Sequence, residues 1–262
     1  MPSVQRMHAA PRCAKFNAMD EITFHTRLHR PGTLLDVGAH DGLITRPFAA
    51  LPDSRVLAFE PLPSAFARLR AAFAPAPPPH VTLIEEALGE ALGSITLAMP
   101  VLDGVAQEQW ASTAKTYADV NADRVAVRSW QVPVRPLDSM GLTDLTHVKL
   151  DCEGAEYEVL RGARETLTRC RPYLTIEIEE RHRLGSTWAV PAFLDALGYE
   201  TYFELDGAWQ HMAALDRATM QRASPDPSVF EASDPYVFVF YVFPRETAEA
   251  ALQRLTRNER WP

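Results

Sequence analysis

The stretch TLLDVGAHDG, residues 33–42, joins a short apolar run to a turn with two glycines and the start of a helical pattern. Gly38 lets the backbone turn tightly and approach a ligand, and Gly42 lets the following helix pack close to the strand. The spacing is not G-x-G-x-x-G, because a histidine replaces the second glycine. Asp36 and Asp41 flank the turn and disfavour a phosphate, so we expect a cationic ligand there.

Outward from this turn, short apolar runs alternate with segments of helical spacing. Strands are predicted at 33–37, 55–59, 81–84, 94–98, 130–134, 146–150, 173–178, 200–205 and 236–243. Helices are predicted at 43–51, 61–73, 116–124, 155–170, 190–197 and 246–258. This alternation is typical of βαβ units, so the sequence predicts an α/β fold with a mostly parallel, doubly wound sheet. The loop-like connection 206–235 predicts that the last two strands form an antiparallel pair at the sheet edge.

Composition excludes several classes of protein. The 262-residue chain has a formal net charge of −8 and 47% hydrophobic residues, which excludes a disordered chain and disfavours a nucleic-acid-binding surface. The longest apolar run, Tyr236–Phe243, is too short for the roughly 20 residues of a membrane span. Three cysteines without metal spacing favour a reducing compartment. We therefore expect a cytoplasmic protein with neither a membrane nor a nucleic acid as partner.

Acidic residues also end the second and third predicted strands. Glu60, followed by Pro61, lies where a carboxylate accepts both ribose hydroxyls of an adenosine in dinucleotide sites. Glu86 ends the next strand, where it and the backbone of Ala87 can face an adenine edge. With Asp36, three successive strand ends are acidic, which indicates a nucleoside ligand.

The fourth strand end reads KLDCEGAE, residues 149–156. Alternation places Lys149 and Asp151 on one face of a buried strand, where a charged group needs a partner. Lys149 is therefore expected to pair with a carboxylate such as Asp151 or to contact ligand. Glu153 opens the next helix, where it can cap the helix or contact the acceptor.

The next strand, TIEIEE from residue 175, carries carboxylates on alternate positions. Glu177 is expected to approach Asp151 from the neighbouring strand, and His182 follows on the loop with a reference pKa suited to proton transfer. Asp151, Glu177 and His182 are thus the candidate catalytic residues. The same three side chains can alternatively hold a divalent metal such as Mg²⁺.

Five segments together resemble the FkbM-type family of S-adenosylmethionine-dependent methyltransferases, within the class I Rossmann-like methyltransferases. They are LLDVGAHDG (34–42), FEPLPSAFARL (59–69), EEALGEALGSITL (85–97), VKLDCEGAEYEVLRGA (148–163) and RPYLTIEIEERH (171–182). The resemblance implies a seven-stranded sheet whose last strand is antiparallel. It assigns residues 31–243 to the methyltransferase domain, between a leader with an N-terminal helix (1–30) and a C-terminal helix (244–262).

The resemblance also implies roles for the strand-end residues. Asp36, Gly38 and Gly42 would hold the methionine part of S-adenosylmethionine, Glu60 the ribose, and Glu86 with Ala87 the adenine. His40 stands where many relatives carry Asn or Gly, so it would crowd or newly contact the cofactor carboxylate. Asp41 and Pro61 complete the expected cofactor site.

The function implied is methyl transfer, first of all to a hydroxyl of a small metabolite, sugar or natural product. The insert 100–130 and the loop 206–235 are expected to cover the acceptor, which Lys149, Glu153, Trp110 and Tyr117 would bind. N-methylation of a small molecule or peptide is the alternative, although no N-P-P-Y-like stretch follows the fourth strand. A non-catalytic nucleoside-binding protein is an alternative from another class. A homodimer is compatible with the sequence.

Overall fold

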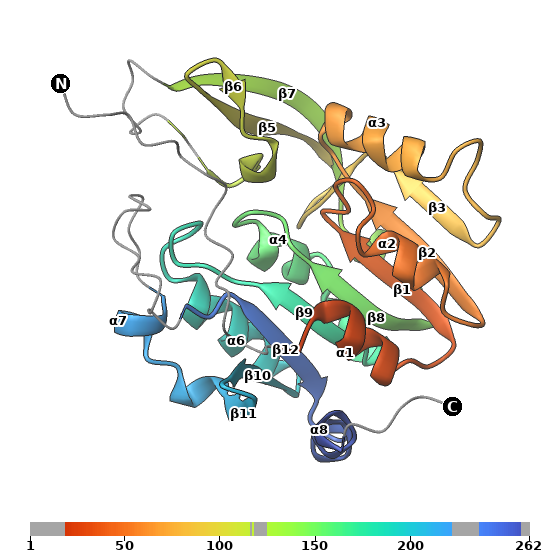
Figure 1. Ribbon diagram of the computed structural model, residues 1–262, viewed down its shortest axis with the longest axis vertical. Helices are drawn as coiled ribbons and strands as arrows, with labels where there is room; N and C mark the ends of the chain where they lie inside the picture. The colour runs from red at the N-terminus through yellow and green to blue at the C-terminus, as the bar shows by residue number, and fades with distance from the viewer. Residues whose placement is uncertain (1–18, 116, 118–124, 222–235, 258–262) are drawn as a thin grey trace.

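The computed structural model describes residues 19–115, 117, 125–221 and 236–257, which form two sheets and their covering helices (Figure 1). The large sheet has the strand order β11-β10-β12-β9-β8-β1-β2-β3. In that order the strands are Ala208–His211, Tyr199–Leu205, Val239–Pro244, Tyr173–Glu177, Leu145–Leu150, Gly32–Val37, Ser54–Phe59 and Val81–Ile84. Strands β9, β8, β1, β2 and β3 are parallel, whereas β12 runs antiparallel between β9 and β10. The doubly wound, mostly parallel α/β fold is therefore confirmed.

Helices cover both faces of the large sheet, because its central strands are apolar on both sides. Leu35 of β1 belongs to a core shared with α4, α5 and α6, whereas its neighbour Leu34 packs on the opposite face with α2 and α3. Helices α1 and α8 cover the antiparallel end of that second face through Phe24 and Leu255. The helices are α1 (Glu21–Arg27), α2 (Thr45–Ala49), α3 (Pro63–Ala72), α4 (Glu156–Arg161), α5 (Arg164–Cys170), α6 (Ser186–Ala196), α7 (Arg217–Met220) and α8 (Ala248–Thr256).

A smaller sheet lies apart from the large one, at the top of Figure 1. It has the order β4-β7-β5-β6, with bounds Ala87–Leu88, Val125–Arg135, Gly93–Leu102 and Val105–Ala106. Its inner face packs on Leu62 and Ala65 at the start of α3. The two extra strands predicted at 94–98 and 130–134 lie within β5 and β7, and they build this sheet instead of joining the large one.

Several predicted elements need correction. The helix predicted at 155–170 is two helices, α4 and α5, separated at Gly162, where a Cβ atom would lie 1.9 Å from the carbonyl oxygen of Gly89. The large sheet has eight strands instead of seven because β11 adds a short edge strand beside β10. The connection 206–235 accordingly contains β11 and α7 in its described part. The helix predicted at 116–124 lies outside the described residues, apart from Tyr117.

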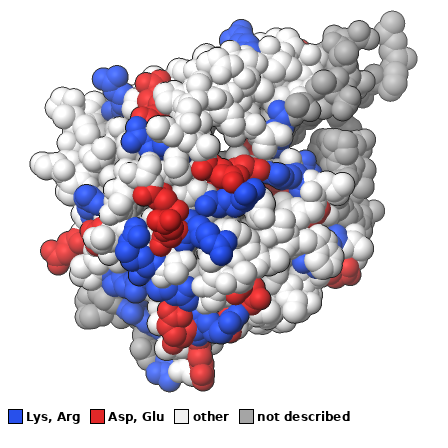
Figure 2. Space-filling view, turned by 180° about the vertical axis from the view of Figure 1, so that it is seen from behind, with Lys and Arg blue, Asp and Glu red and all other residues white. Residues whose placement is uncertain are grey.

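Charges are mixed on the face turned away from the viewer of Figure 1. Figure 2 shows acidic and basic side chains interspersed there, and surface pairs such as Arg161–Glu90 and Arg183–Glu158 match this pattern. Among the helices within the described ranges, none is long and apolar enough to cross a membrane.

Candidate active site

One cavity of about 420 Å³ opens at the carboxyl ends of the central parallel strands. Doubly wound sheets bind ligands at this edge, because the connections diverge to opposite faces there. One wall, called the turn side below, consists of residues 36–41, 60–62 and 86–88. The opposite wall, called the acidic side, consists of residues 151–153 and Glu177. Glu108, Gln109, Ala111 and Thr113, which follow the smaller sheet's β6, also contribute to the lining.

The turn after β1 is fixed by its contact with the end of β8. Gly38 has a φ of +76°, and a Cβ atom there would lie 1.8 Å from the carbonyl oxygen of Asp151. Only glycine fits this position, as the sequence predicted. Gly42, also at positive φ, packs on Leu69 of α3 and does not line the cavity. Gly42 therefore supports the turn from behind.

Lys149 joins the two sides. Its Nζ donates to the carbonyl oxygen of Gly38 at 2.9 Å, and lies 3.4 Å from Asp151 Oδ2 and 3.8 Å from Asp36 Oδ1. Burial alone would lower the pKa of Lys149, but the carboxylates of Asp151 and Asp36 hold it above its ordinary value. The expected pairing of Lys149 with Asp151 is confirmed, and Lys149 also lines the cavity.

Asp36 is fully buried, and burial raises its pKa. Its Oδ2 accepts a hydrogen bond from Thr45 Oγ1 at 2.6 Å, but Oδ1 accepts none within the described chain. The cavity-lining carboxylate thus keeps one oxygen for a further donor, such as an ammonium group.

Glu60 and Glu86 end β2 and β3 as predicted, but their carboxylates are held differently. Glu60 is buried and accepts from the backbone N–H groups of His40 and Leu62, each at 2.8 Å. Burial raises the pKa of Glu60. Glu86 instead forms a two-pronged pair with the guanidinium of Arg135 on β7 while still lining the cavity. The smaller sheet thereby fixes the wall beside Ala87.

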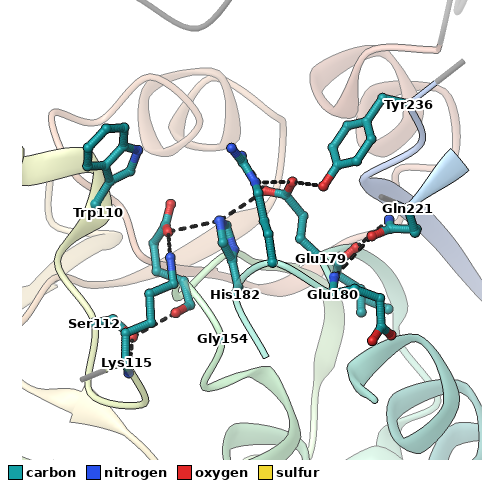
Figure 3. Close-up of polar contacts among 12 residues, drawn as sticks. Trp110, Ser112, Lys115, Gly154, Glu179, Glu180, His182, Gln221 and Tyr236 are labelled. Carbon is teal, nitrogen blue, oxygen red and sulfur yellow. Dashed lines mark hydrogen bonds and ion pairs between the residues drawn. The ribbon is translucent and has the colours of Figure 1, made fainter. Parts of the chain in front are cut away.

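On the acidic side, Glu153 is held in a strained backbone conformation, with a φ of +57°. The hydroxyl of Ser112 donates to its carbonyl oxygen at 2.7 Å. Its Oε2 lies 2.5 Å from Lys115 Nζ and 3.2 Å from His182 Nε2 (Figure 3). Burial raises the pKa of Glu153 to about 8, against the opposing effect of Lys115.

His182 links Glu153 to Glu179. The same Nε2 that faces Glu153 lies 3.1 Å from Glu179 Oε1, and burial lowers the pKa of His182 to about 4. Glu179 is buried, which opposes ionisation, but the two-pronged pair with Arg181 and the charge of His182 lower its pKa to about 2. The hydroxyl of Tyr236 also donates to Glu179 (Figure 3).

The site and the sequence can now be compared with known proteins. A family model described as the methyltransferase FkbM domain matches residues 36–201, which include both sides of the cavity. The chain belongs to the FkbM methyltransferase family. It is therefore an S-adenosylmethionine-dependent methyltransferase.

Several individual proteins are similar to this chain. The 2-O-methyltransferase NoeI of Sinorhizobium fredii is 30% identical over 176 residues, which span 63% of this chain and 70% of NoeI. Among solved structures, a methyltransferase FkbM from Methylobacillus flagellatus has 18% identity and a TM-score of 0.49, over 84% of this chain but only 46% of its own. A precorrin-6y C5,15-methyltransferase from Geobacter metallireducens has 14% identity and a TM-score of 0.42, over 85% of both chains.

The turn side of this FkbM methyltransferase fits S-adenosylmethionine. Oδ1 of Asp36 accepts no hydrogen bond within the described chain and suits the cofactor's ammonium group, and the glycine at position 38 leaves room beside it. His40, Asp41, Pro61 and Ala87 line the same wall, as expected. His40 has a φ of +51°, a conformation that favours Gly or Asn and tolerates His.

The expected metal ligands are not the ones that the structure brings together. Glu153, Glu177 and His182 each offer an atom within 4.8 Å of the others, so Glu153 takes the place predicted for Asp151. The ammonium of Lys115 already neutralises Glu153 there, and His182 directs Nε2 at two carboxylates. This FkbM site therefore favours a hydrogen-bonded network over a metal centre.

Some of the other predicted site residues line the cavity and some do not. Asp151, Glu177, Lys149 and Glu153 line the cavity, but His182 lies behind Glu153. Trp110 and Tyr117, predicted to bind acceptor, are outside the lining, because the Tyr117 hydroxyl donates to the carbonyl oxygen of Trp110. Their neighbours line the cavity instead, namely Glu108, Gln109, Ala111 and Thr113.

Three residues of the site were not predicted from the sequence. Glu21, at the start of α1, reaches the cavity and hydrogen-bonds with Thr175. Glu156, not Glu153, caps the turn before α4, accepting from the backbone N–H groups of Cys152 and Gly154. Lys115 had one usable signal, because lysine occurs only three times in the chain. Two of those lysines, Lys115 and Lys149, lie at this site.

Proposed function

We propose that this FkbM methyltransferase methylates a hydroxyl of a small, uncharged acceptor rich in hydroxyl groups, such as a sugar or a glycosylated metabolite. The observation that carries the proposal is the arrangement of the cavity. Carboxylates that can accept a proton face the same space as the turn that fits the cofactor. A hydroxyl acceptor needs such a group, because it must lose its proton as the new bond forms.

The charge of the cavity supports an uncharged acceptor. Among the described residues that line it, nine are acidic and Lys149 is the one lysine or arginine. A phosphate or carboxylate on the acceptor would lie among these carboxylates without a free cation to pair with. Neutral hydroxyl groups can instead donate hydrogen bonds to them.

The relative NoeI supports oxygen over nitrogen as the methylated atom. It is described as a 2-O-methyltransferase and is 30% identical to this chain over 176 residues. N-methylation is the competing outcome, and a nucleoside-binding protein without transfer activity is the other.

When bound, S-adenosylmethionine supplies a methyl group on a positively charged sulfur. The chain's own contribution is first to orient it, because an in-line displacement depends on alignment of the reacting atoms. Asp36 would hold the ammonium group, Glu60 the ribose hydroxyls, and the wall at Ala87 the adenine. Asp151, Glu153 and Glu177 would face the acceptor hydroxyl.

Transfer from methyl-labelled cofactor tests the proposal. The acceptor panel contains matched neutral glycosides, amino sugars and sugar phosphates, and each product is located by mass spectrometry and NMR. We expect label on an oxygen of the neutral acceptors and at least about tenfold less on the phosphates. Label found on nitrogen alone would contradict O-methylation.

Two controls separate the alternatives. Tight binding of S-adenosylhomocysteine without transfer to any member of the panel or to cell extract would favour a nucleoside-binding protein. Activity that EDTA abolishes and Mg²⁺ restores would favour the metal arrangement of Glu153, Glu177 and His182.

A further inference from the structure

Three carboxylates of the acidic side line the cavity, and Glu153 is the one that two side chains hold through a single oxygen. Lys115 and His182 both approach Oε2 of Glu153, at 2.5 and 3.2 Å. Within the described chain, Oε1 of Glu153 accepts no hydrogen bond. The pairing thus fixes the carboxylate through one oxygen and leaves the other for an acceptor hydroxyl.

Glu177 and Asp151 are less suited to accept a proton. Glu177 hydrogen-bonds with Glu179, and burial together with the charges of Asp151 and Glu179 raises its pKa, which disfavours the ionised form that a proton acceptor needs. Asp151 is the nearer counter-ion of Lys149. A proton on Asp151 would leave the buried Lys149 with the more distant Asp36 alone.

We propose that Glu153 is the proton acceptor of the methyl transfer, and that Lys115 and His182 are its positioning residues. This inference rests on the O-methylation proposed above. From the sequence, Glu153 was expected to bind the acceptor and His182 to be a candidate base. The proposal gives the role of base to Glu153 and makes His182 a residue that positions it.

The step balances without a further reactant. The acceptor oxygen forms a bond to the methyl carbon while the bond from that carbon to sulfur breaks. The hydroxyl proton moves to Oε1 of Glu153, and the sulfur leaves as a neutral thioether. Glu153 then returns the proton to solvent when the product leaves.

The positioning residues are themselves anchored. Since Nε2 of His182 faces two carboxylate oxygens, the ring carries its proton on Nε2 and donates to both. Arg181 and Tyr236 fix Glu179 on the far side (Figure 3). Gly154 allows the close approach, because a Cβ atom there would lie 3.1 Å from the carbonyl oxygen of His182.

The charges around Glu153 predict the direction of its titration. Lys115 lowers its pKa, whereas burial and the carboxylates of Asp151 and Glu179 raise it. The groups that face it are Lys115, Asp151, Glu177, Glu179, Arg181 and His182. Removal of the Lys115 charge must therefore raise the pKa of Glu153, and activity should then appear only at higher pH.

Kinetics with the acceptor found in the glycoside panel give the first test. Glu153→Gln should lower kcat by about 10²–10⁴-fold and leave the Kd for S-adenosylhomocysteine within threefold of wild type. Glu158→Gln, a glutamate outside the cavity lining that pairs with Arg183, is the matched control and should keep wild-type kcat. Lys115→Met should move the acidic limb of the kcat profile upward by at least half a pH unit, and Lys115→Arg should restore it. Retention of half the wild-type kcat by Glu153→Gln would overturn the inference while O-methylation stood.

A second measurement works without any acceptor. Carbon-13 NMR of glutamate carboxyl groups, as the difference between wild type and Glu153→Gln with S-adenosylhomocysteine bound, gives the pKa of Glu153. We expect titration above pH 6 in wild type and a further rise in Lys115→Met. A pKa near the ordinary value of about 4.3, unchanged in Lys115→Met, would overturn the inference. Label on nitrogen in the glycoside panel would instead overturn the O-methylation on which it rests.

Discussion

The two sides of the cavity are held by different means. On the turn side, Glu60 is fixed by backbone N–H groups, and Gly38 is fixed by contact with backbone. On the acidic side, Glu153 is fixed by side chains from segments far away in the sequence, such as Lys115 and His182. Backbone groups keep the same hydrogen-bonding chemistry when side chains are substituted. The turn side therefore suits a ligand that stays the same, such as the cofactor. The acidic side can change its chemistry by exchange of side chains alone.

Lys149 is the exception, because it belongs to both sides. We expect Lys149→Met to have the largest effect of any single change at the site. Loss of the ammonium leaves the buried Asp36 and the adjacent Asp151 without their cation, which destabilises a protein by about 3–5 kcal/mol. Chemical denaturation at neutral pH measures the free energy of unfolding, and calorimetry with S-adenosylhomocysteine measures binding.

Lys115→Met is the control for that variant, since Lys115 pairs only on the acidic side. It should lower the unfolding free energy by less than Lys149→Met does and keep S-adenosylhomocysteine affinity. Equal effects of both substitutions on affinity would show that the two sides are not separable.

Gly38→Ala tests the turn side at its closest contact. The added methyl group would overlap the carbonyl oxygen of Asp151 at a φ of +76°, so the turn must move. We expect at least about 100-fold weaker S-adenosylhomocysteine binding by calorimetry. Gly93→Ala is the matched control, because nothing lies within 4 Å of a Cβ atom there. An affinity loss of the same size in Gly93→Ala would contradict the role of the turn.

Glu60→Gln should have a smaller effect on the same side. The two backbone N–H groups of His40 and Leu62 would lose a charged acceptor, and one would face the amide NH₂ group. Hydrogen bonds to charged groups contribute about 1.5–3 kcal/mol, which corresponds to roughly a 10–100-fold rise in Kd for S-adenosylhomocysteine. Glu85→Gln, an exposed glutamate at the end of the neighbouring strand β3, is the control and should bind normally. Unchanged affinity in Glu60→Gln would place the ribose elsewhere.

The same contrast explains what the sequence could predict. Strand ends and turns follow from local pattern, so Asp36, Gly38, Glu60 and Glu86 were placed correctly from residue spacing. Lys115 and Glu21 are brought to the cavity by the smaller sheet and by α1, and no local spacing encodes that packing. Packing also decides which of Glu153 and His182 reaches the cavity. The strained turn at Glu153 places its carboxylate between His182 and the cavity.

The residues packed behind the two sides of the cavity also differ. The turn side is backed by apolar side chains such as Phe48, whereas β8 and β9 carry buried polar groups near α1. His25 of α1 contacts His147 Nδ1 and Thr175 Oγ1, each at 3.0 Å. Burial lowers the pKa of His25 to about 3, and burial with the charges of His25, Arg30 and His29 lowers that of His147.

This pair predicts the acid sensitivity of the fold. Both histidines are neutral in the folded protein, whereas in the unfolded chain they protonate below about pH 6.5. The unfolded state therefore binds more protons than the folded state between pH 6.5 and about 3. The free energy of unfolding falls as pH falls through that window, by up to about 1.4 kcal/mol per pH unit for each histidine. Denaturation of His25→Phe at several pH values should show a shallower slope than wild type even if the variant is less stable at pH 8. His80→Gln, at an exposed histidine, should keep the wild-type slope. If His25→Phe also kept the wild-type slope, groups other than His25 and His147 would cause the acid sensitivity.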